Sequence, residues 1–166
     1  MEKYIEVKTS YSEKEVRKAI SFYIWRIYKL RTYTIIAYTV MFLAAILSLL
    51  FSPYSILTPV LLFCGLLFHY FYYIRPVESY LNYYRKSKNP TYRFSDEKVL
   101  STSKEIQSTI LWTVFKKAYN IPAAFLLTDE NKFVYVLPKN CFCSELDIDE
   151  FSKMLIRKTV YYNMCK

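Results

Sequence analysis

The feature that most constrains this chain is its uncharged central stretch, because residues 32–74 contain no Asp, Glu, Lys or Arg. Such a stretch is too long for one buried helix and about right for two apolar spans with a short turn. Residues 33–51 would extend about 28 Å at about 1.5 Å per residue, close to the hydrocarbon thickness of a bilayer. The sequence therefore predicts a transmembrane helical hairpin over residues 32–74, with spans near 33–51 and 56–74. The alternative is a pair of buried helices in a soluble all-α domain.

Aromatic and basic residues flank both spans, as is typical of membrane interfaces. The aromatic flanks are Tyr23, Trp25, Tyr28 and Tyr33 before the first span, and His69, Tyr70, Tyr72 and Tyr73 at the end of the second. Lys and Arg occur on both outer sides and are absent from the turn, so the positive-inside rule predicts cytoplasmic termini. The expected location is the cell membrane, as a protein with two spans.

The composition excludes several kinds of site. The chain has one Gly and one His, whereas phosphate-binding loops need several glycines and zinc sites or Ser-His-Asp triads rely on histidine. We therefore expect no catalytic residues, no metal and no cofactor, and the protein is predicted not to be an enzyme. His69 is the candidate intramembrane polar site, although a neutral interfacial His beside Tyr70 is an alternative. Gly65 lies inside the second span, where it permits close approach of the first.

Cationic residues follow the second span, in a basic juxtamembrane segment at residues 75–90 and just beyond it. The candidate membrane-surface residues are Arg75, Arg85, Lys86, Lys88 and Arg93. We expect them to contact an anionic leaflet, while the alternative is that they only fix the topology. Nucleic acid is not an expected partner, because the aromatic residues cluster at the membrane boundaries and not along a soluble basic stripe.

The Cys141-Phe142-Cys143 sequence is a single C-x-C, whereas zinc sites use pairs of C-x₂₋₄-C. We interpret these cysteines as structural; the alternative is a redox or metal role. Cys64 lies within the second span, where it behaves as a small apolar residue.

The N-terminal segment, residues 1–31, combines a strand at residues 2–8 with a helix that opens at the capping box Ser12-x-x-Glu15. Apolar residues recur at helical spacing after it, at Val16, Ala19, Ile20, Tyr23 and Ile27. This stripe either lies on the membrane surface or packs on the C-terminal domain, and the helix is continuous with the first span if nothing breaks it.

The C-terminal segment, residues 91–166, is rich in short β-type runs. The predicted strands are 91–95, 99–103, 107–112, 118–121, 124–128 and 133–137, and a final helix is predicted to be capped by Asp147. The fold class is therefore α+β: a transmembrane hairpin plus a small antiparallel β domain closed by a C-terminal helix. A curved sheet or open barrel with the helix as its plug, to which the N-terminal strand adds or on which it packs, would bury these faces.

In this order of elements the chain resembles the YcxB-like bacterial membrane protein family. The matching residues are Tyr92 to Glu97, Ile110 to Trp112, Lys116-Lys117, Val136 to Asn140 and the Asp147 to Lys158 helix. The resemblance implies a pleckstrin-homology-like C-terminal domain, and it carries over no site residues because the family is largely uncharacterised. The chain departs from the family at Asn140, where Arg is frequent, and at Asn120-Ile121-Pro122, which interrupts a strand region.

The predicted function is that of a non-enzymatic, membrane-anchored cytoplasmic binding or regulatory module. The expected partners are lipid headgroups of an anionic leaflet, a peptide strand at a sheet edge, another protein or a second copy of the chain. An alternative is an immunity or defence protein that protects the membrane against a pore-forming toxin, and a third class is an enzyme that uses Cys141 or Cys143.

Overall fold

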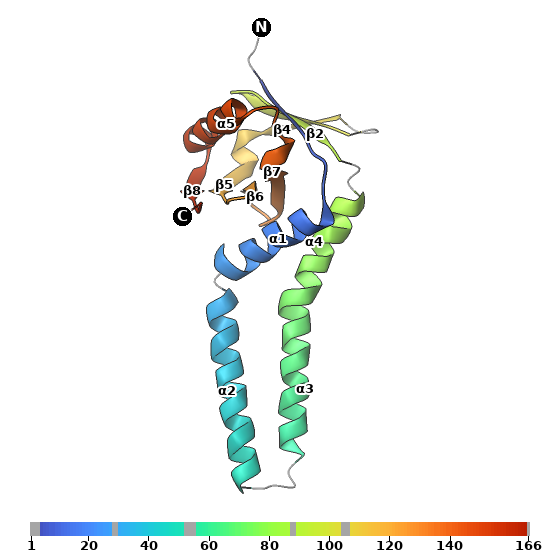
Figure 1. The fold of residues 1–166 in the computed structure, drawn as a ribbon, viewed down its shortest axis with the longest axis vertical. Helices are drawn as coiled ribbons and strands as arrows, with labels where there is room; N and C mark the ends of the chain where they lie inside the picture. Colours follow the sequence, from blue (N-terminus) through green and yellow to red (C-terminus); the bar gives the residue numbers. More distant parts are fainter. Residues whose placement is uncertain (1–3, 28–29, 52–55, 87–88, 104–106, 166) are drawn as a thin grey trace. The chain divides into compact units, whose positions relative to one another are not determined.

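A computed structural model describes residues 4–27, 30–51, 56–86, 89–103 and 107–165 (Figure 1). The chain divides into two compact units, one made of residues 1–20 and 81–166 and the other of residues 21–80. The first unit thus combines the N-terminal residues with the β-rich C-terminal segment.

One sheet of the first unit joins the N-terminal strand to the C-terminal segment. Its strands, in the order β1-β2-β3-β4, are β1 (Ile5–Lys8), β2 (Thr91–Phe94), β3 (Lys98–Thr102) and β4 (Gln107–Leu111). All neighbours are antiparallel, and β1 pairs with β2 from Ile5 opposite Phe94 to Lys8 opposite Thr91. The expectation that the N-terminal strand adds to this domain is confirmed.

The second sheet is mixed and not purely antiparallel. Its order is β7 (Val134–Pro138), β6 (Ala124–Asp129), β5 (Phe115–Asn120) and β8 (Val160–Asn163). Helix α5 (Glu145–Lys158) precedes β8, which returns parallel to β5, and a parallel return requires a crossover segment such as this helix. The structure thus has two four-stranded sheets, one of them mixed, in place of a curved antiparallel sheet, and the helix is followed by a further strand.

Helix α5 begins one turn earlier than the sequence suggested. Its N-cap is Ser144, whose hydroxyl oxygen accepts a hydrogen bond from the Asp147 backbone N–H at 3.1 Å. Asp147 instead lies in the first turn, where a carboxylate interacts favourably with the helix dipole. The predicted apolar face is confirmed, because Phe151, Met154 and Leu155 are buried.

Both sheets and α5 share one aromatic core. The Phe151 ring is fully buried, and its centroid lies 4.6 Å from that of Phe94, 5.2 Å from that of Phe125 and 5.2 Å from that of Phe142. These rings come from the first sheet, the second sheet, the segment before α5 and α5 itself. Since large aromatic rings dominate the energetics of burial, this cluster holds the two sheets together.

Helix α1 (Glu13–Phe22) settles one alternative left by the sequence. Its residues Val16, Ala19 and Ile20 are buried and belong to the same unit as the sheets. These three residues of the apolar stripe therefore pack within the domain, while Tyr23 and Ile27 belong to the second unit. A short π-helix, η1 (Tyr23–Ile27), follows, and its predicted continuity with the first span falls on residues 28–29, outside the described residues.

The second unit contains the helices predicted as spans. These are α2 (Leu30–Phe51), α3 (Leu57–His69) and the π-helical η2 (Tyr70–Ile74), after which the helix continues as α4 (Arg75–Lys86). Thr58 donates a hydrogen bond to the Ser48 hydroxyl at 3.2 Å. A Cβ placed on Gly65 would lie 3.2 Å from the Cε of Met41, so α3 contacts a side chain of α2 at this glycine.

The described residues include one helix, Thr58–Lys86, that is long and apolar enough to cross a membrane, and a second span only if helices 13–27 and 32–48 are taken together. Large apolar side chains on these helices face outward: Phe42 is 68% exposed and Leu66 is 70% exposed. Soluble monomers rarely leave such surfaces uncovered, so the helices favour membrane association over a pair of buried helices.

Candidate functional site

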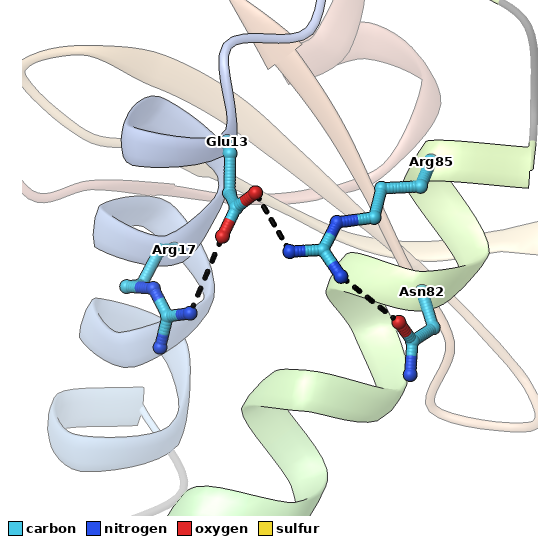
Figure 2. Close-up of polar contacts among 4 residues, drawn as sticks. All are labelled: Glu13, Arg17, Asn82 and Arg85. Atoms are coloured by element: carbon cyan, nitrogen blue, oxygen red, sulfur yellow. Dashed lines mark hydrogen bonds and ion pairs between the residues drawn. The ribbon is translucent and has the colours of Figure 1, made fainter.

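Four polar residues join the beginning of α1 to the end of α4, and we call them the basic clamp: Glu13, Arg17, Asn82 and Arg85 (Figure 2). Glu13 receives the Arg85 guanidinium at 2.7 Å on one carboxylate oxygen and the Arg17 guanidinium at 3.4 Å on the other. Arg85 also donates to the amide oxygen of Asn82 at 3.3 Å. Two cations therefore converge on one carboxylate, and the cluster keeps a net positive charge.

Local sequence explains only part of the clamp. The backbone N–H groups of Glu15 and Val16 both donate to the Ser12 carbonyl, which opens α1 and places Glu13 in its first turn. Arg17 follows four residues later, at the spacing at which helical side chains face each other. Arg85 lies 72 residues further along the chain from Glu13, so only the tertiary fold brings it there.

The electrostatics of the clamp are those of an exposed ion pair. The hydrogen bond from Arg85, followed by the charge of that side chain, lowers the pKa of the Glu13 carboxyl below its ordinary value. The side chains of Glu13 and Arg85 are about half exposed, and exposed ion pairs contribute little net stability. The main effect of the clamp is therefore on geometry: it holds the Arg85 and Arg17 side chains beside the Glu13 carboxylate.

A cavity of about 230 Å³ lies beside the clamp. Its lining combines clamp residues with apolar and aromatic neighbours: Tyr11, Glu13, Val16, Leu81, Tyr84, Arg85 and Asn89. The Tyr11 backbone N–H donates to the Asn89 side-chain oxygen at 3.2 Å, and Asn89 has a φ of 50°, which asparagine tolerates better than most residues. Burial raises the pKa of the Tyr11 phenol and raises that of Tyr92 to about 12, so both hydroxyls stay protonated.

Tyr84 attaches α4 to the edge of the second sheet. Its hydroxyl donates to the Val134 carbonyl at 2.6 Å and accepts from the Val136 backbone N–H at 2.8 Å. Tyr84 and both valines are buried. The phenol therefore satisfies backbone groups of the edge strand β7 that would otherwise have no partner from a neighbouring strand.

The two cysteines of the C-x-C sequence have different surroundings. The Cys141 sulfur is half-buried and accepts from the Ser10 backbone N–H at 3.4 Å, whereas Cys143 is exposed. Burial raises the pKa of the Cys141 thiol, which disfavours the reactive thiolate. Within the part of the chain that the structure describes, no group of three or more His, Cys, Asp or Glu residues is placed to hold a metal ion.

Glu15 of α1 faces the segment that contains Cys141. One of its carboxylate oxygens accepts from the Asn140 side-chain amide at 3.1 Å. The other is buried and has no hydrogen-bond partner among the described residues. An unpartnered buried oxygen costs free energy, so the contact between α1 and the segment before α5 is less than optimal.

The described members of the predicted membrane-surface set have different surroundings. Arg85 belongs to the clamp, and Arg93 pairs with Glu6 at 3.1 Å and lies over the Tyr4 ring. The Arg75 guanidinium lies 5.5 Å from the centre of the Phe71 ring. Lys86 is exposed, and Lys88 lies outside the described residues.

His69 lies in the second unit, at a groove between α2 and α3. The groove has a volume of about 880 Å³, and its residues are apolar apart from Tyr38, Thr39 and His69. The His69 ring lies 5.4 Å from that of Tyr73 and 6.4 Å from that of Tyr38. The candidate intramembrane polar residue therefore sits among aromatic rings, as expected near an interface.

Sequence reasoning missed three residues that position the first unit, Glu13, Asn82 and Tyr84. It assigned Glu15 to a capping box, whereas the structure shows its carboxylate in contact with Asn140. Tyr84 carried a usable signal, because Leu81 and Tyr84 follow Val77 at helical spacing and thus mark one apolar face. Glu13 and Glu15 contact Arg85 and Asn140, which come from distant parts of the chain, and no local pattern indicates these pairs. Asn82 contacts Arg85 three residues further along the same helix.

Comparison with known proteins identifies one domain. Residues 94–155 match the family described as YcxB-like protein. No curated protein and no solved structure matches the chain. The match extends from the end of β2 into α5, so the predicted resemblance is confirmed over most of the β-rich segment.

Proposed function

Residues 94–155 form a YcxB-like domain, and from this premise we propose that the chain is a non-enzymatic binding module anchored in the bacterial cell membrane. A hairpin of two spans, near residues 33–51 and 56–74, tethers the domain to the cytoplasmic face. The domain recognises a partner there: an anionic leaflet, another protein or a second copy of the chain.

The observation that carries this proposal is the pairing of β1 with β2. The chain passes into the second unit in the last turn of α1, after Ile20, and returns to the first unit within α4, at Leu81. A segment whose two ends belong to one folded unit must begin and end on the same side of a membrane. An apolar excursion of this length therefore crosses the bilayer twice or not at all, and the outward-facing apolar side chains favour two crossings.

Contact with anionic lipid is proposed for the exposed cations near the end of the second span. Arg75 and Lys86 are described by the structure, and Lys88 follows them in the sequence. Arg85 and Arg93 are engaged with Glu13 and Glu6, so their contribution to lipid binding is reduced. Each well-placed cation contributes about 1 kcal/mol near an anionic surface.

The experiment that tests the proposal maps the topology of the full chain. Cys143 and Cys165 are exposed in the domain, and a membrane-impermeant maleimide should label them in inverted membrane vesicles and not in intact spheroplasts. In a chain whose four cysteines are replaced by Ser, Ser55→Cys in the predicted turn should show the opposite pattern. Labelling of all these sites from one side would refute the two-span anchor, as would release of the chain from vesicles by alkaline carbonate.

A further inference from the structure

The groove between α2 and α3 in the second unit is polar at one end and apolar at the other. Its lining residues run from Tyr38 to Ala45 on α2 and from Leu61 to His69 on α3, and the two helices run side by side (Figure 1). The rings of Tyr38 and His69 face each other, with centroids 6.4 Å apart. These two side chains and Thr39 therefore mark one end, and Ala45 and Leu61 mark the other.

The polar end of the groove offers hydrogen-bond donors. The Thr39 hydroxyl donates to the Ile35 carbonyl of its own helix at 2.9 Å. The Tyr38 hydroxyl and the His69 ring make ring contacts but no hydrogen bond among the described residues. Residues 32–74 contain no Asp or Glu that could accept from them. A phenol and an imidazole each carry a donor, so the polar end is complementary to an acceptor group.

The depth of this end separates the groove from an ordinary lipid-facing surface. In the predicted spans, Tyr38 lies five residues after Tyr33 and His69 lies five residues before Ile74. Both side chains are therefore attached about 7–8 Å inside the apolar layer, at about 1.5 Å per residue. That layer supplies no water as a hydrogen-bond partner, and an unpaired polar group there costs free energy. Hydrocarbon tails fill the apolar end equally well but leave both donors unpaired.

We propose that this groove binds one long-chain fatty acid. The carboxyl group accepts from the Tyr38 hydroxyl and the His69 ring, and the alkyl chain follows the apolar lining towards Ala45 and Leu61. The inference rests on the proposed membrane anchor, which places the groove in a bilayer. A carboxyl group accepts hydrogen bonds whether or not it is ionised. The groove volume of about 880 Å³ is typical of sites for small molecules, which span roughly 300–1,000 Å³.

The shape of the groove favours a single chain over larger occupants. A helix with its side chains is about 10–12 Å wide, whereas α3 contacts the Met41 side chain of α2 at Gly65. A second copy of the hairpin therefore covers the groove from outside without reaching the donors between the helices. A phospholipid carries its charged phosphate at the membrane surface, above the level of Tyr38 and His69. A carboxyl group at the end of one alkyl chain is narrow enough and reaches this depth.

The first test is photochemical labelling of the full chain in phosphatidylcholine vesicles. The probe is palmitic acid with a diazirine at the middle of its chain, and the labelled residues are mapped by mass spectrometry. We expect the label on the apolar part of the groove, near Ala45 and Leu61. Unlabelled palmitic acid should suppress labelling, whereas hexadecane should do so about tenfold more weakly or less, because it lacks the group that both donors bind. Equal suppression by the two competitors overturns the proposal.

Two pairs of variants test the two ends of the groove. Tyr38→Phe removes one oxygen and should weaken competition by palmitic acid about twofold to tenfold. Tyr72→Phe is its control, because Tyr72 is 53% exposed and is not a groove residue. Leu62→Trp should fill the apolar part and prevent labelling there. Phe63→Trp should leave labelling unchanged, because Phe63 lies outside the groove although its exposure of 61% is close to the 63% of Leu62.

The outcomes separate the site from the anchor. A vesicle-bound chain whose labelling is unaffected by both Tyr38→Phe and Leu62→Trp overturns the fatty-acid site. A Leu62→Trp variant that changes the oligomeric state and not the labelling assigns this face to a second copy, which also overturns it. A chain that does not float with vesicles overturns the anchor itself, and the fatty-acid site with it.

Discussion

Replacing Tyr84 with Phe removes one oxygen atom and leaves the ring in place. The Tyr84 hydroxyl donates to the Val134 carbonyl at 2.6 Å and accepts from the Val136 N–H at 2.8 Å. Tyr84 is 6% exposed, and the two valines are 0% and 1% exposed. Water therefore has little access to the carbonyl and N–H groups that the substitution leaves without a partner.

The expected cost follows from these two bonds. A typical hydrogen bond contributes about 0.5–1.5 kcal/mol net, and leaving a buried donor or acceptor unsatisfied costs about 1–3 kcal/mol. Two bonds lost together, with some relaxation of the β7 edge, should lower the free energy of unfolding by about 2–3 kcal/mol. Packing changes little, because the Phe ring keeps the edge-on contact with Tyr11, whose ring centroid lies 4.6 Å away.

The assay is urea denaturation of the full chain in detergent. The chain has two tryptophans, so Trp25→Phe leaves the buried Trp112 as the only indole reporting on the first unit. Tyr83→Phe is the matched control, because the Tyr83 side chain is 48% exposed, and we expect a change below about 0.5 kcal/mol. Leu81→Ala should cost about 2–5 kcal/mol as a buried truncation.

The reasoning would be refuted by a Tyr84→Phe variant whose unfolding free energy lies within about 0.5 kcal/mol of the parent while Leu81→Ala is clearly destabilised. That result would show that α4 packs on the domain but that the Tyr84 hydroxyl does not satisfy the β7 edge.

Three further predictions concern the clamp, the core and the helix pair. The pKa of Glu13 is lowered in the folded state, so its contribution to the free energy of unfolding is present above the unfolded pKa and is lost as pH falls through the folded pKa. Glu13→Gln should therefore make the difference in unfolding free energy between neutral pH and pH below about 4.5 smaller than in the parent. Urea titration at both pH values measures this difference. Phe151→Ala should lower the unfolding free energy by about 3–5 kcal/mol, measured in the same way, because it empties the centre of the aromatic core. Gly65→Ala should be tolerated because the neighbouring Met41 side chain is flexible. Gly65→Leu should lower the free energy of unfolding in detergent by about 1–3 kcal/mol through overpacking, measured by thermal denaturation.

Much of the secondary structure was predictable because its signals are local. The strand runs at 91–95, 99–103 and 124–128 match β2, β3 and β6 to within one residue at each end. Periodicity also indicated the buried faces of α1 and α5, since a repeating apolar spacing has meaning only on a helix or strand. The predicted N-cap of α5 was wrong. Ser144 and Asp147 are both good capping residues, and the sequence does not say which one adopts the extended conformation that a cap requires.

The uncharged stretch over residues 32–74 is the strongest property that the sequence determined by itself. Placing a charged side chain in an apolar medium costs much free energy. A segment of this length without charged side chains is therefore typical of an apolar environment. The sequence also shows where the cations lie along the chain, but it does not show what they contact. Nothing near Arg85 and Arg93 in the sequence indicates an ion pair, and the fold pairs them with Glu13 and Glu6.

Only the tertiary structure decided that the two ends of the chain form one unit. The pairing of β1 with β2, the clamp and the parallel strand β8 all join residues far apart in the sequence. Such contacts depend on how apolar faces stack and on which edge remains free, and many arrangements satisfy the same local pattern. In the structure, the uncharged stretch therefore lies within a segment that interrupts a single domain, because the chain before and after that segment belongs to the same unit.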